Sequence, residues 1–134
     1  MAERVPVGVL DTSVVIDLGS VEPGLLPVIP RISTITLAEL GLGLHTTTDP
    51  AELAVRAERL QRAESAFDPL PFTTDAARRF TQITGLVVAA GRSPKPRRLD
   101  MMIAAIASVR RLPLYTRNGA DFAGLDSVLT TFVV

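Results

Sequence analysis

The stretch VPVGVLDTS, residues 5–13, joins a short apolar run to a polar end. Residues 5–10 are apolar and rich in β-branched side chains, which predicts a buried strand. Asp11 stands at the carboxyl end of that strand, and residues 14–18 are expected to form a short helix. Because ligands of open α/β sheets bind beyond the carboxyl ends of the strands, Asp11 is the first candidate for a functional residue.

Outward from this stretch, short strands alternate with helices, which favours right-handed crossovers and a mainly parallel sheet covered on both faces. Asp49 and Pro50 give a good helix start, and Gly91 a good helix end. The expected elements are a loop or broken helix over 20–30, a strand over 31–35, helices over 36–44, 49–67 and 75–90, a basic loop over 92–98, a helix over 99–110, a strand over 112–116, a turn at 118–119 and a last strand over 128–134.

Composition narrows the chemistry. The 134 residues fit a single domain spanning 1–134, with no cysteine and one histidine, His45. Histidine triads and Cys or His zinc sites are therefore excluded, and we expect His45 to lie at a helix end. The equal counts of 14 basic and 14 acidic residues argue against a polybasic protein but allow a local basic patch. Without a membrane-length apolar run or a signal peptide, we expect a cytoplasmic protein with no membrane association.

Four acids stand where the predicted topology would bring them together: Asp11, Glu39, Asp100 and Asp121. Asp11 and Asp121 come just after predicted strands, and Glu39 lies one helical turn after another. Asp100 lies in the first turn of a late helix that follows a loop. Converging carboxylates repel one another, and a bound cation offsets that cost. Hard oxygen donors without cysteine favour Mg²⁺ or Mn²⁺, and such a metal suits hydrolysis of phosphodiesters.

Each acid also has a purely local interpretation. Asp11 can cap the helix that follows it, and Asp100 can favour the positive end of a helix dipole. Glu39 follows Thr36 by three residues, as in a capping box, and Asp121 can be a turn residue. A further acid, Asp17, is expected on a solvated face. The sequence pattern alone leaves both interpretations open.

Four motifs in order resemble those of PIN-domain nucleases, and the chain is similar over nearly its whole length to VapC toxins of toxin–antitoxin pairs. The motifs are VLDTSVVI at 9–16, STITLAEL at 33–40, RRLDMMIAA at 97–105 and LYTRNGADF at 114–122. The resemblance implies a PIN-like three-layer α/β/α sandwich with a mainly parallel sheet. It also implies endoribonuclease activity dependent on Mg²⁺ or Mn²⁺, a homodimer, and neutralisation by a cognate VapB-type antitoxin.

Carried over by motif, the resemblance assigns three of the main acids to Asp11, Glu39 and Asp100. The fourth position falls on Asp121 or Asn118, and we favour Asp121, with Asn118 holding a water or substrate oxygen. Small hydroxyl positions near the site match Thr12, Ser13 and Thr116, which could equally serve in local turns and caps. We hypothesise that Asp11 and Asp100 bind the metal, while Glu39 and Asp121 orient waters, support a second ion or act as base.

A basic segment directly precedes the third acid. Its cations are Arg92, Lys95, Arg97 and Arg98, which could grip RNA phosphates or form a solvated loop. Arg117 could contact RNA or pair with a site carboxylate. We expect the antitoxin to dock in a groove between the Glu39 helix and the helix over 49–67, whose leucines otherwise pack within the core.

Two other classes of protein compete with the nuclease hypothesis. A catalytically silent PIN-like module could act only through a protein partner, although unused clustered carboxylates would cost stability. A receiver-type phosphoacceptor also places an aspartate at a strand end, but paired acids after the first strand and a late lysine are not evident. The sequence does not identify the RNA that would be cut.

Overall fold

The computed structural model describes residues 4–134. Its centre is a sheet in the order β2-β1-β3-β4, formed by β1 (Val7–Leu10), β2 (Ile29–Arg31), β3 (Leu114–Thr116) and β4 (Thr131–Val133). All three strand pairings are parallel, which confirms the expected sheet type. Parallel pairing requires crossovers, so the carboxyl ends of the strands gather at one edge of the sheet.

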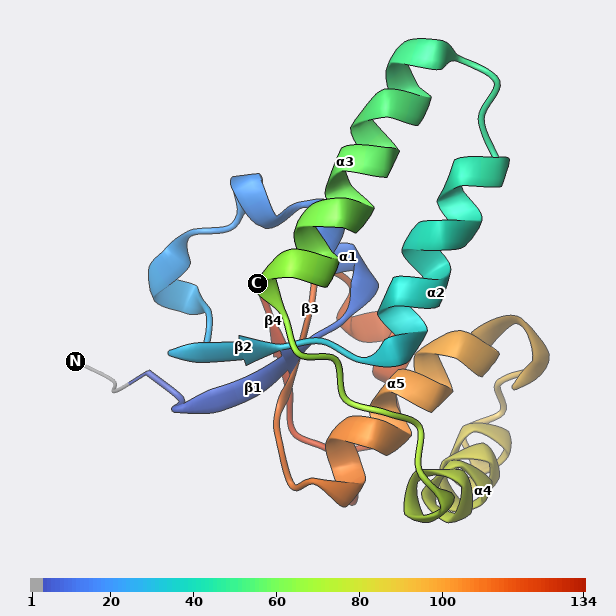
Figure 1. Ribbon diagram of the computed structural model, residues 1–134. Coiled ribbons are helices and arrows are strands. Elements are labelled where there is room, and N and C mark those ends of the chain that lie inside the picture. The colour runs from blue at the N-terminus through green and yellow to red at the C-terminus, as the bar shows by residue number, and fades with distance from the viewer. Residues whose placement is uncertain (1–3) are drawn as a thin grey trace.

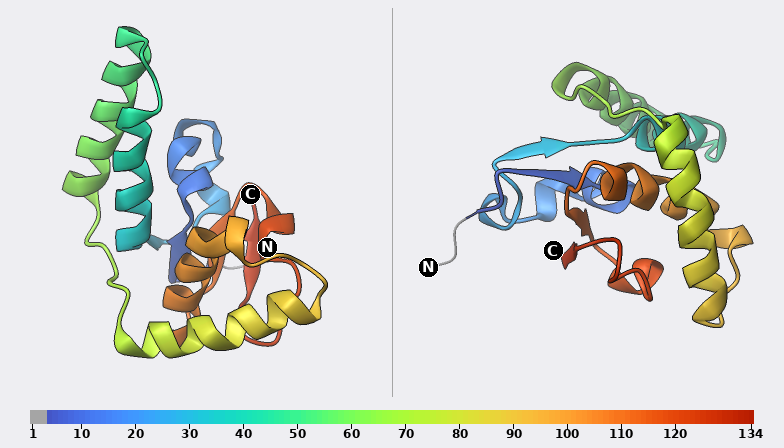
Figure 2. Two further views of the ribbon diagram at one scale, coloured as in Figure 1. Left: turned by 90° about the vertical axis from the view of Figure 1, so that its right-hand side faces the viewer. Right: turned by 90° about the horizontal axis from the view of Figure 1, so that it is seen from below.

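Helices cover both faces of the sheet (Figures 1 and 2). They are α1 (Thr12–Ile16), α2 (Thr34–Leu42), α3 (Pro50–Ala66), α4 (Thr74–Ala89) and α5 (Arg98–Val109). Helices α2 and α3 lie side by side and project from the sheet, while α4 runs beneath α5 in the view of Figure 1. No helix within residues 4–134 is long and apolar enough to cross a membrane.

Successive residues of β1 enter different cores, because side chains alternate across a strand. Val9 and its β3 partner Leu114 are buried in a cluster with α4 and α5. Leu10 and its partner Tyr115 belong to a second cluster, which includes residues of α1, α2 and α3. Two cores on opposite faces give the expected three-layer sandwich, and they fix the direction in which β1 delivers Asp11.

The segment around β2 differs from the expectation. The predicted strand over 31–35 is wrong, since β2 ends at Arg31 and α2 begins at Thr34. Ser33 caps this helix by accepting a hydrogen bond from Thr36 N at 3.2 Å. Thr36 is therefore inside the helix, and the capping box that would have explained Glu39 locally does not exist. Residues 20–30, expected as a loop or broken helix, hold a short 3₁₀ helix over Pro23–Leu25 and the start of β2.

Most other boundaries agree within a few residues. Asp49 caps α3, Thr73 caps α4, and Gly91 has a positive φ of 74° just after α4. Two segments expected as loop and turn contain short 3₁₀ helices, over Lys95–Arg97 and Gly119–Phe122, and Asn118 caps the latter. His45 ends the 3₁₀ helix Gly43–His45, as expected of a residue at a helix end. The last strand is shorter than predicted and starts at Thr131.

Candidate active site

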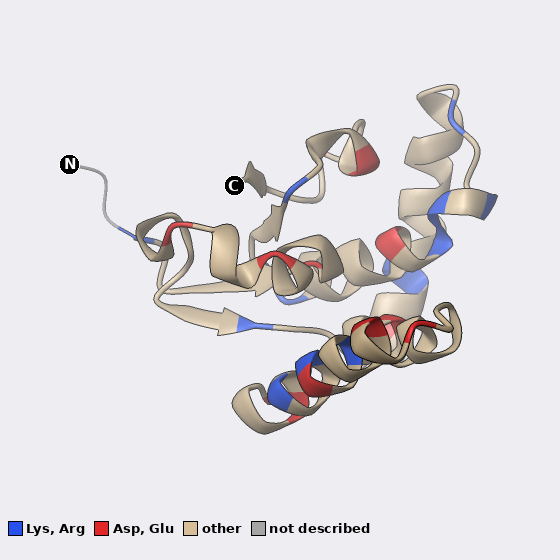
Figure 3. Cartoon of the chain, turned by 90° about the horizontal axis from the view of Figure 1, so that it is seen from above, with Lys and Arg blue, Asp and Glu red and all other residues tan. Residues whose placement is uncertain are grey.

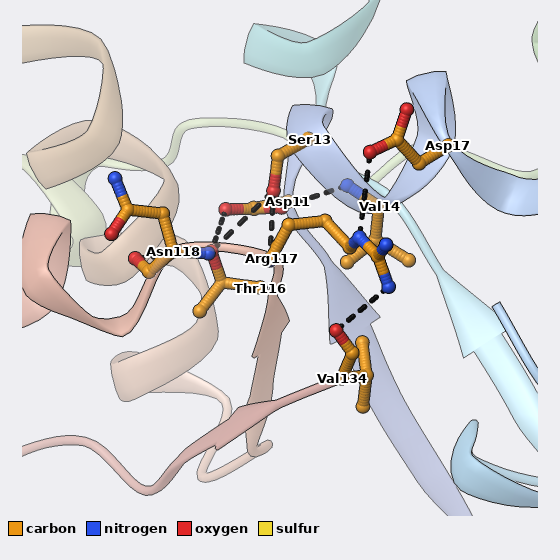
Figure 4. A network of polar contacts seen from close by, with 8 residues as sticks. All are labelled: Asp11, Ser13, Val14, Asp17, Thr116, Arg117, Asn118 and Val134. Atoms are coloured by element: carbon orange, nitrogen blue, oxygen red, sulfur yellow. Dashed lines mark hydrogen bonds and ion pairs between the residues drawn. The ribbon is translucent and has the colours of Figure 1, made fainter. Parts of the chain in front are cut away.

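Asp11 is held at the carboxyl end of β1 by three donors (Figure 4). Its Oδ1 accepts hydrogen bonds from Ser13 Oγ at 2.5 Å and from Val14 N at 3.1 Å. Its Oδ2 accepts a hydrogen bond from Thr116 Oγ1 at 2.5 Å. Only 3% of Asp11 is exposed, so these donors offset the cost of burying a carboxylate. Asp11 thus caps α1, as its local interpretation predicts, and this role leaves it at the strand end where the functional interpretation needs it.

The hydroxyls around Asp11 are themselves fixed by backbone groups of the next loop. Ser13 Oγ accepts from Arg117 N at 3.0 Å, and Thr116 Oγ1 accepts from Asn118 N at 3.1 Å. Asn118 Oδ1 accepts from Ala120 N at 3.3 Å, which caps the 3₁₀ helix that carries Asp121. The amide of Asn118 therefore has a capping role, and its loop links the ends of β1 and β3.

Glu39 reaches the same region from α2. Thr12 Oγ1 donates a hydrogen bond to Glu39 Oε1 at 2.6 Å and lies 3.1 Å from Thr36 Oγ1. Burial raises the pKa of Glu39, the hydrogen bond from Thr12 lowers it, and the charge of Asp11 raises it. Because Thr12 directly follows Asp11, its hydrogen bond places Glu39 close to the end of β1.

Asp100 has the most perturbed carboxyl of the described residues. Burial raises its pKa to about 7, with further upward contributions from the charges of Asp121, Glu39 and Asp11 and a downward one from Arg97. The charges of the other three predicted acids therefore all act on Asp100. Asp100 lies in the first turn of α5, as predicted. Strong shifts with specific charge partners are typical of functional sites.

The four acids lie in the same region but do not form a ready-made set of metal ligands. Within residues 4–134, no group of three or more acidic or histidine side chains is spaced so that all could hold a metal ion directly. Part of each of two carboxylates is instead engaged by hydroxyls, Asp11 by Ser13 and Thr116, and Glu39 by Thr12. The four acids are thus close enough for three of them to affect the pKa of Asp100, but three of their side chains are not placed to bind one metal ion directly.

The basic segment directly precedes Asp100, which lies in the first turn of α5. Figure 3 shows how the basic and acidic residues of the chain are distributed over it. Several of its guanidinium groups bind main-chain carbonyls: Arg92 binds Ala120 O, Arg97 binds Ser93 O at 2.9 Å, and Arg98 binds Lys95 O at 3.1 Å. Arg97 also lowers the pKa of Asp100, and its Nε is buried without a partner among the described residues. Lys95 and Arg98 are exposed, and the Nη atoms of Arg98 are in no hydrogen bond among the described residues.

Arg117 does not pair with any of the four acids. Its Nε lies 3.4 Å from Asp17 Oδ2, and its Nη1 donates to Val134 O at 2.8 Å (Figure 4). Asp17 was expected on a solvated face, and it is indeed exposed, with the ion pair to Arg117 formed at the surface. Sequence reasoning missed the pair because the residues are far apart in the chain and meet only through the β1–β3 pairing.

A parallel α/β sandwich with acids at the carboxyl edge of its sheet defines a PIN-like protein of the nuclease class, although no protein-family model matches the chain. The chain is 37% identical to Ribonuclease VapC5 of Mycobacterium tuberculosis over 95% of this chain and 93% of that protein. It therefore belongs to the VapC family of ribonucleases.

Solved structures agree with this membership. The crystal structure of VapBC-5, a member of the VapBC family of toxin–antitoxin systems from Mycobacterium tuberculosis, matches with a TM-score of 0.83 and 32% identity, covering 96% of this chain and 98% of that one. FitAcB from Neisseria gonorrhoeae matches with a TM-score of 0.71 and 27% identity, covering 94% and 96% of the two chains. The predicted PIN-like fold and the resemblance to VapC toxins are confirmed.

Proposed function

We propose that this chain is a metal-dependent endoribonuclease, the toxin of a VapBC-type pair, with Asp11, Glu39, Asp100 and Asp121 as its site. The observation that carries the proposal is the pKa of Asp100, raised to about 7 by burial and by the three other acids. Such a concentration of negative charge is costly unless a cation binds. A catalytically silent binding module would gain nothing from clustered carboxylates that lower its stability. The similarity to a ribonuclease of the same family also favours the enzyme over that alternative.

The donor set fits Mg²⁺ or Mn²⁺. Mg²⁺ prefers oxygen ligands, is commonly held by one or two carboxylates and keeps several waters, so it does not require three acids in direct contact. Asp11 and Asp100 are the proposed ligands. When bound, the ion would activate water and stabilise charge on the attacked phosphate.

The remaining groups act on water and on orientation. Glu39 has Oε1 bound to Thr12, which leaves Oε2 without a hydrogen-bond partner among the described residues. We assign Glu39 and Asp121 to hold the attacking water and to accept its proton, because a nearby carboxylate can serve as general base. Thr12, Ser13 and Thr116 position the carboxylates that they bind. In-line attack would leave a 5′-phosphate and a 3′-hydroxyl.

Exposed Lys95 and Arg98, beside Asp100, are the proposed contacts for RNA phosphates near the acids. Arg98 binds Lys95 O only through its Nε, which leaves both of its Nη groups for RNA, whereas Arg92, Arg97 and Arg117 each bind a main-chain carbonyl through Nη1.

An apolar cavity of about 790 Å³ offers the place for an antitoxin segment, on the α1 side of α3 and not in the expected groove between α2 and α3. It lies between α3 and the end of α1, and its lining includes the exposed residues Ile16, Leu18 and Val55. Of the leucines on α2, Leu40 is buried while Leu42 is 58% exposed. Core packing therefore accounts for Leu40 but not for Leu42. The family's occurrence as VapBC complexes supports an antitoxin as the occupant. Exposed apolar side chains at both sheet edges, Ile29 and Val133 among them, support a homodimer.

The test is cleavage of total cellular RNA by the purified full chain across a titration of Mg²⁺, with Mn²⁺ as substitute and a chelator as control. We expect cleavage that rises with metal, stops with chelator, and leaves 5′-phosphate ends detectable by ligation. Cleavage that persists undiminished in excess chelator would contradict the metal-dependent site.

A further inference from the structure

A second cavity, of about 960 Å³, lies at the edge of the sheet opposite the acids. Its walls come from the first turns of α4, the last turn of α5, and the segments that lead into β3 and β4. Because the strands are parallel, their beginnings share one edge and their carboxyl ends the other. This cavity, here called the rear cleft, is therefore separate from the site of the four acids.

The rear cleft contains the only described residue other than glycine with a positive φ, Arg111 at 56°. Helices α4 and α5 end in the same hydrogen-bond pattern. After α4, Gly91 N donates to Val88 O and Arg92 N to Val87 O; after α5, Arg111 N donates to Ser108 O and Leu112 N to Ala107 O. Glycine is preferred at this left-handed position because other side chains strain it. The chain uses glycine after α4 and accepts strain at Arg111 after α5.

The strained residue Arg111 lines the rear cleft, together with Arg78 and Arg79. Arg79 is half-buried, and its Nη1 donates to Ser108 Oγ at 2.5 Å, while Ser108 Oγ donates to Val128 O at 2.7 Å. No ion pair joins Arg79 or Arg111 to an acid within residues 4–134. A guanidinium fixed by a neutral hydroxyl keeps further N–H donors for an anion.

The charge of the rear cleft also favours an anion. Its lining holds three arginines against Asp75 and Asp126, and Asp75 is engaged by Arg78 at 3.2 Å. Arginine groups match phosphate oxygens through paired donors. Phe132, 40% exposed, also lines the cleft and offers an apolar ring against which a base could stack.

Helix α5 connects the two regions. Asp100 lies in its first turn and Ser108 in its last, and eight residues at the helical rise separate them by about 12 Å along the axis. We propose that the rear cleft is a second phosphate-binding site, at which Arg79 and Arg111 hold the backbone of an RNA strand at a distance from the acids. This inference rests on the proposed function, since it adds a remote contact for the same substrate.

The test compares Arg111→Gly with Arg110→Gly in the full chain. Both variants lose one positive charge, but Arg110 is exposed and does not line the rear cleft. Binding of a fluorescent single-stranded RNA is measured in chelator, so that no cleavage occurs, over a range of salt concentrations. We expect Arg111→Gly to reduce the salt slope of log K by about 0.7 and to raise the thermal midpoint by relieving strain. Arg110→Gly should leave the salt slope unchanged and should not raise the thermal midpoint, because Arg110 has a negative φ and no strain to relieve.

A second arm uses inorganic phosphate, detected by amide chemical shifts near Ser108 and Arg111. Saturable shifts that vanish in Arg111→Gly, together with the altered RNA slope, support the proposal. Shifts without any change in RNA binding would show a site for small phosphate ligands and overturn the RNA contact. An Arg111→Gly variant that is only more stable, with RNA and phosphate binding intact, would overturn the site altogether. Metal-dependent cleavage by the unmodified chain is scored separately, so failure here leaves the proposed function standing.

Discussion

Thr116 Oγ1 donates a hydrogen bond to Asp11 Oδ2 at 2.5 Å, although the two residues are 105 positions apart. They meet because β1 and β3 are neighbouring parallel strands and both end at the same edge of the sheet. Thr116 is fully buried, and its hydroxyl also accepts from Asn118 N. One hydroxyl thus ties a site carboxylate to the loop that precedes Asp121.

Thr116→Val keeps the shape of this side chain and removes its hydroxyl. We expect the free energy of unfolding to fall by about 1–3 kcal/mol, because a buried carboxylate oxygen loses its donor. RNA cleavage should fall as well, since Asp11 is then less firmly oriented. Denaturant unfolding and cleavage rates measure the two effects.

The matched control for this variant is Thr131→Val on β4, whose hydroxyl is in no hydrogen bond that the structure describes. It should change stability and cleavage little. Equal behaviour of the two variants would show that the contact with Asp11 contributes nothing.

The pKa of Asp100 predicts an unusual dependence of stability on pH in the metal-free protein. Between its ordinary value of 3.8 and the raised value of about 7, the folded state keeps a proton that the unfolded chain has lost. Unfolding free energy therefore falls as pH rises through that window. Asp100→Asn should weaken this loss, and thermal unfolding in chelator at about pH 5 and about pH 8 measures it.

Asp68→Asn, which changes an exposed acid outside the site, should retain the pH dependence of the unmodified chain. The prediction fails if Asp100→Asn and the unmodified chain lose the same thermal midpoint between the two pH values.

If the antitoxin binds in the cavity between α1 and α3, substitutions in the lining of that cavity should weaken its binding. Val55 is 50% exposed and lines that cavity, so Val55→Glu would place a charge against an apolar partner. We expect the affinity for the VapB-type antitoxin to fall by about tenfold or more, with RNA cleavage unchanged. Val88→Glu on α4, at a similarly exposed valine, should bind as the unmodified chain does. Equal affinities of the two variants in a titration would remove this cavity from the interface.

The sequence was sufficient to position those acids that lie beside strong local signals of secondary structure. The apolar run before Asp11 predicts a buried strand, and the basic loop before Asp100 predicts a helix start, so both residues were put at the correct ends of their elements. The helix start at Asp49 and the helix end at Gly91 were also local signals and were predicted correctly.

The remaining features depend on pairing across the chain. Glu39 was given a capping interpretation because Thr36 precedes it by three residues, yet Ser33 is the true cap, since β2 ends earlier than its apolar pattern suggests. The donors to Asp11 and Glu39 and the pair of Arg117 with Asp17 join residues brought together only by the sheet order. Short 3₁₀ helices such as Gly119–Phe122 carry too little periodicity to be predicted.

The most direct test of the account is the rate of Mg²⁺-dependent RNA cleavage by Asp11→Asn against Asp17→Asn. Both variants replace one carboxylate near α1, but Asp17 lies outside the four acids and pairs only with Arg117. We predict that Asp11→Asn keeps the fold, as judged by circular dichroism, and loses cleavage by at least about a hundredfold, as expected when a metal-binding or catalytic group is removed. Asp17→Asn should cleave at nearly the unmodified rate. Cleavage by Asp11→Asn at the unmodified rate would contradict the assignment of this site.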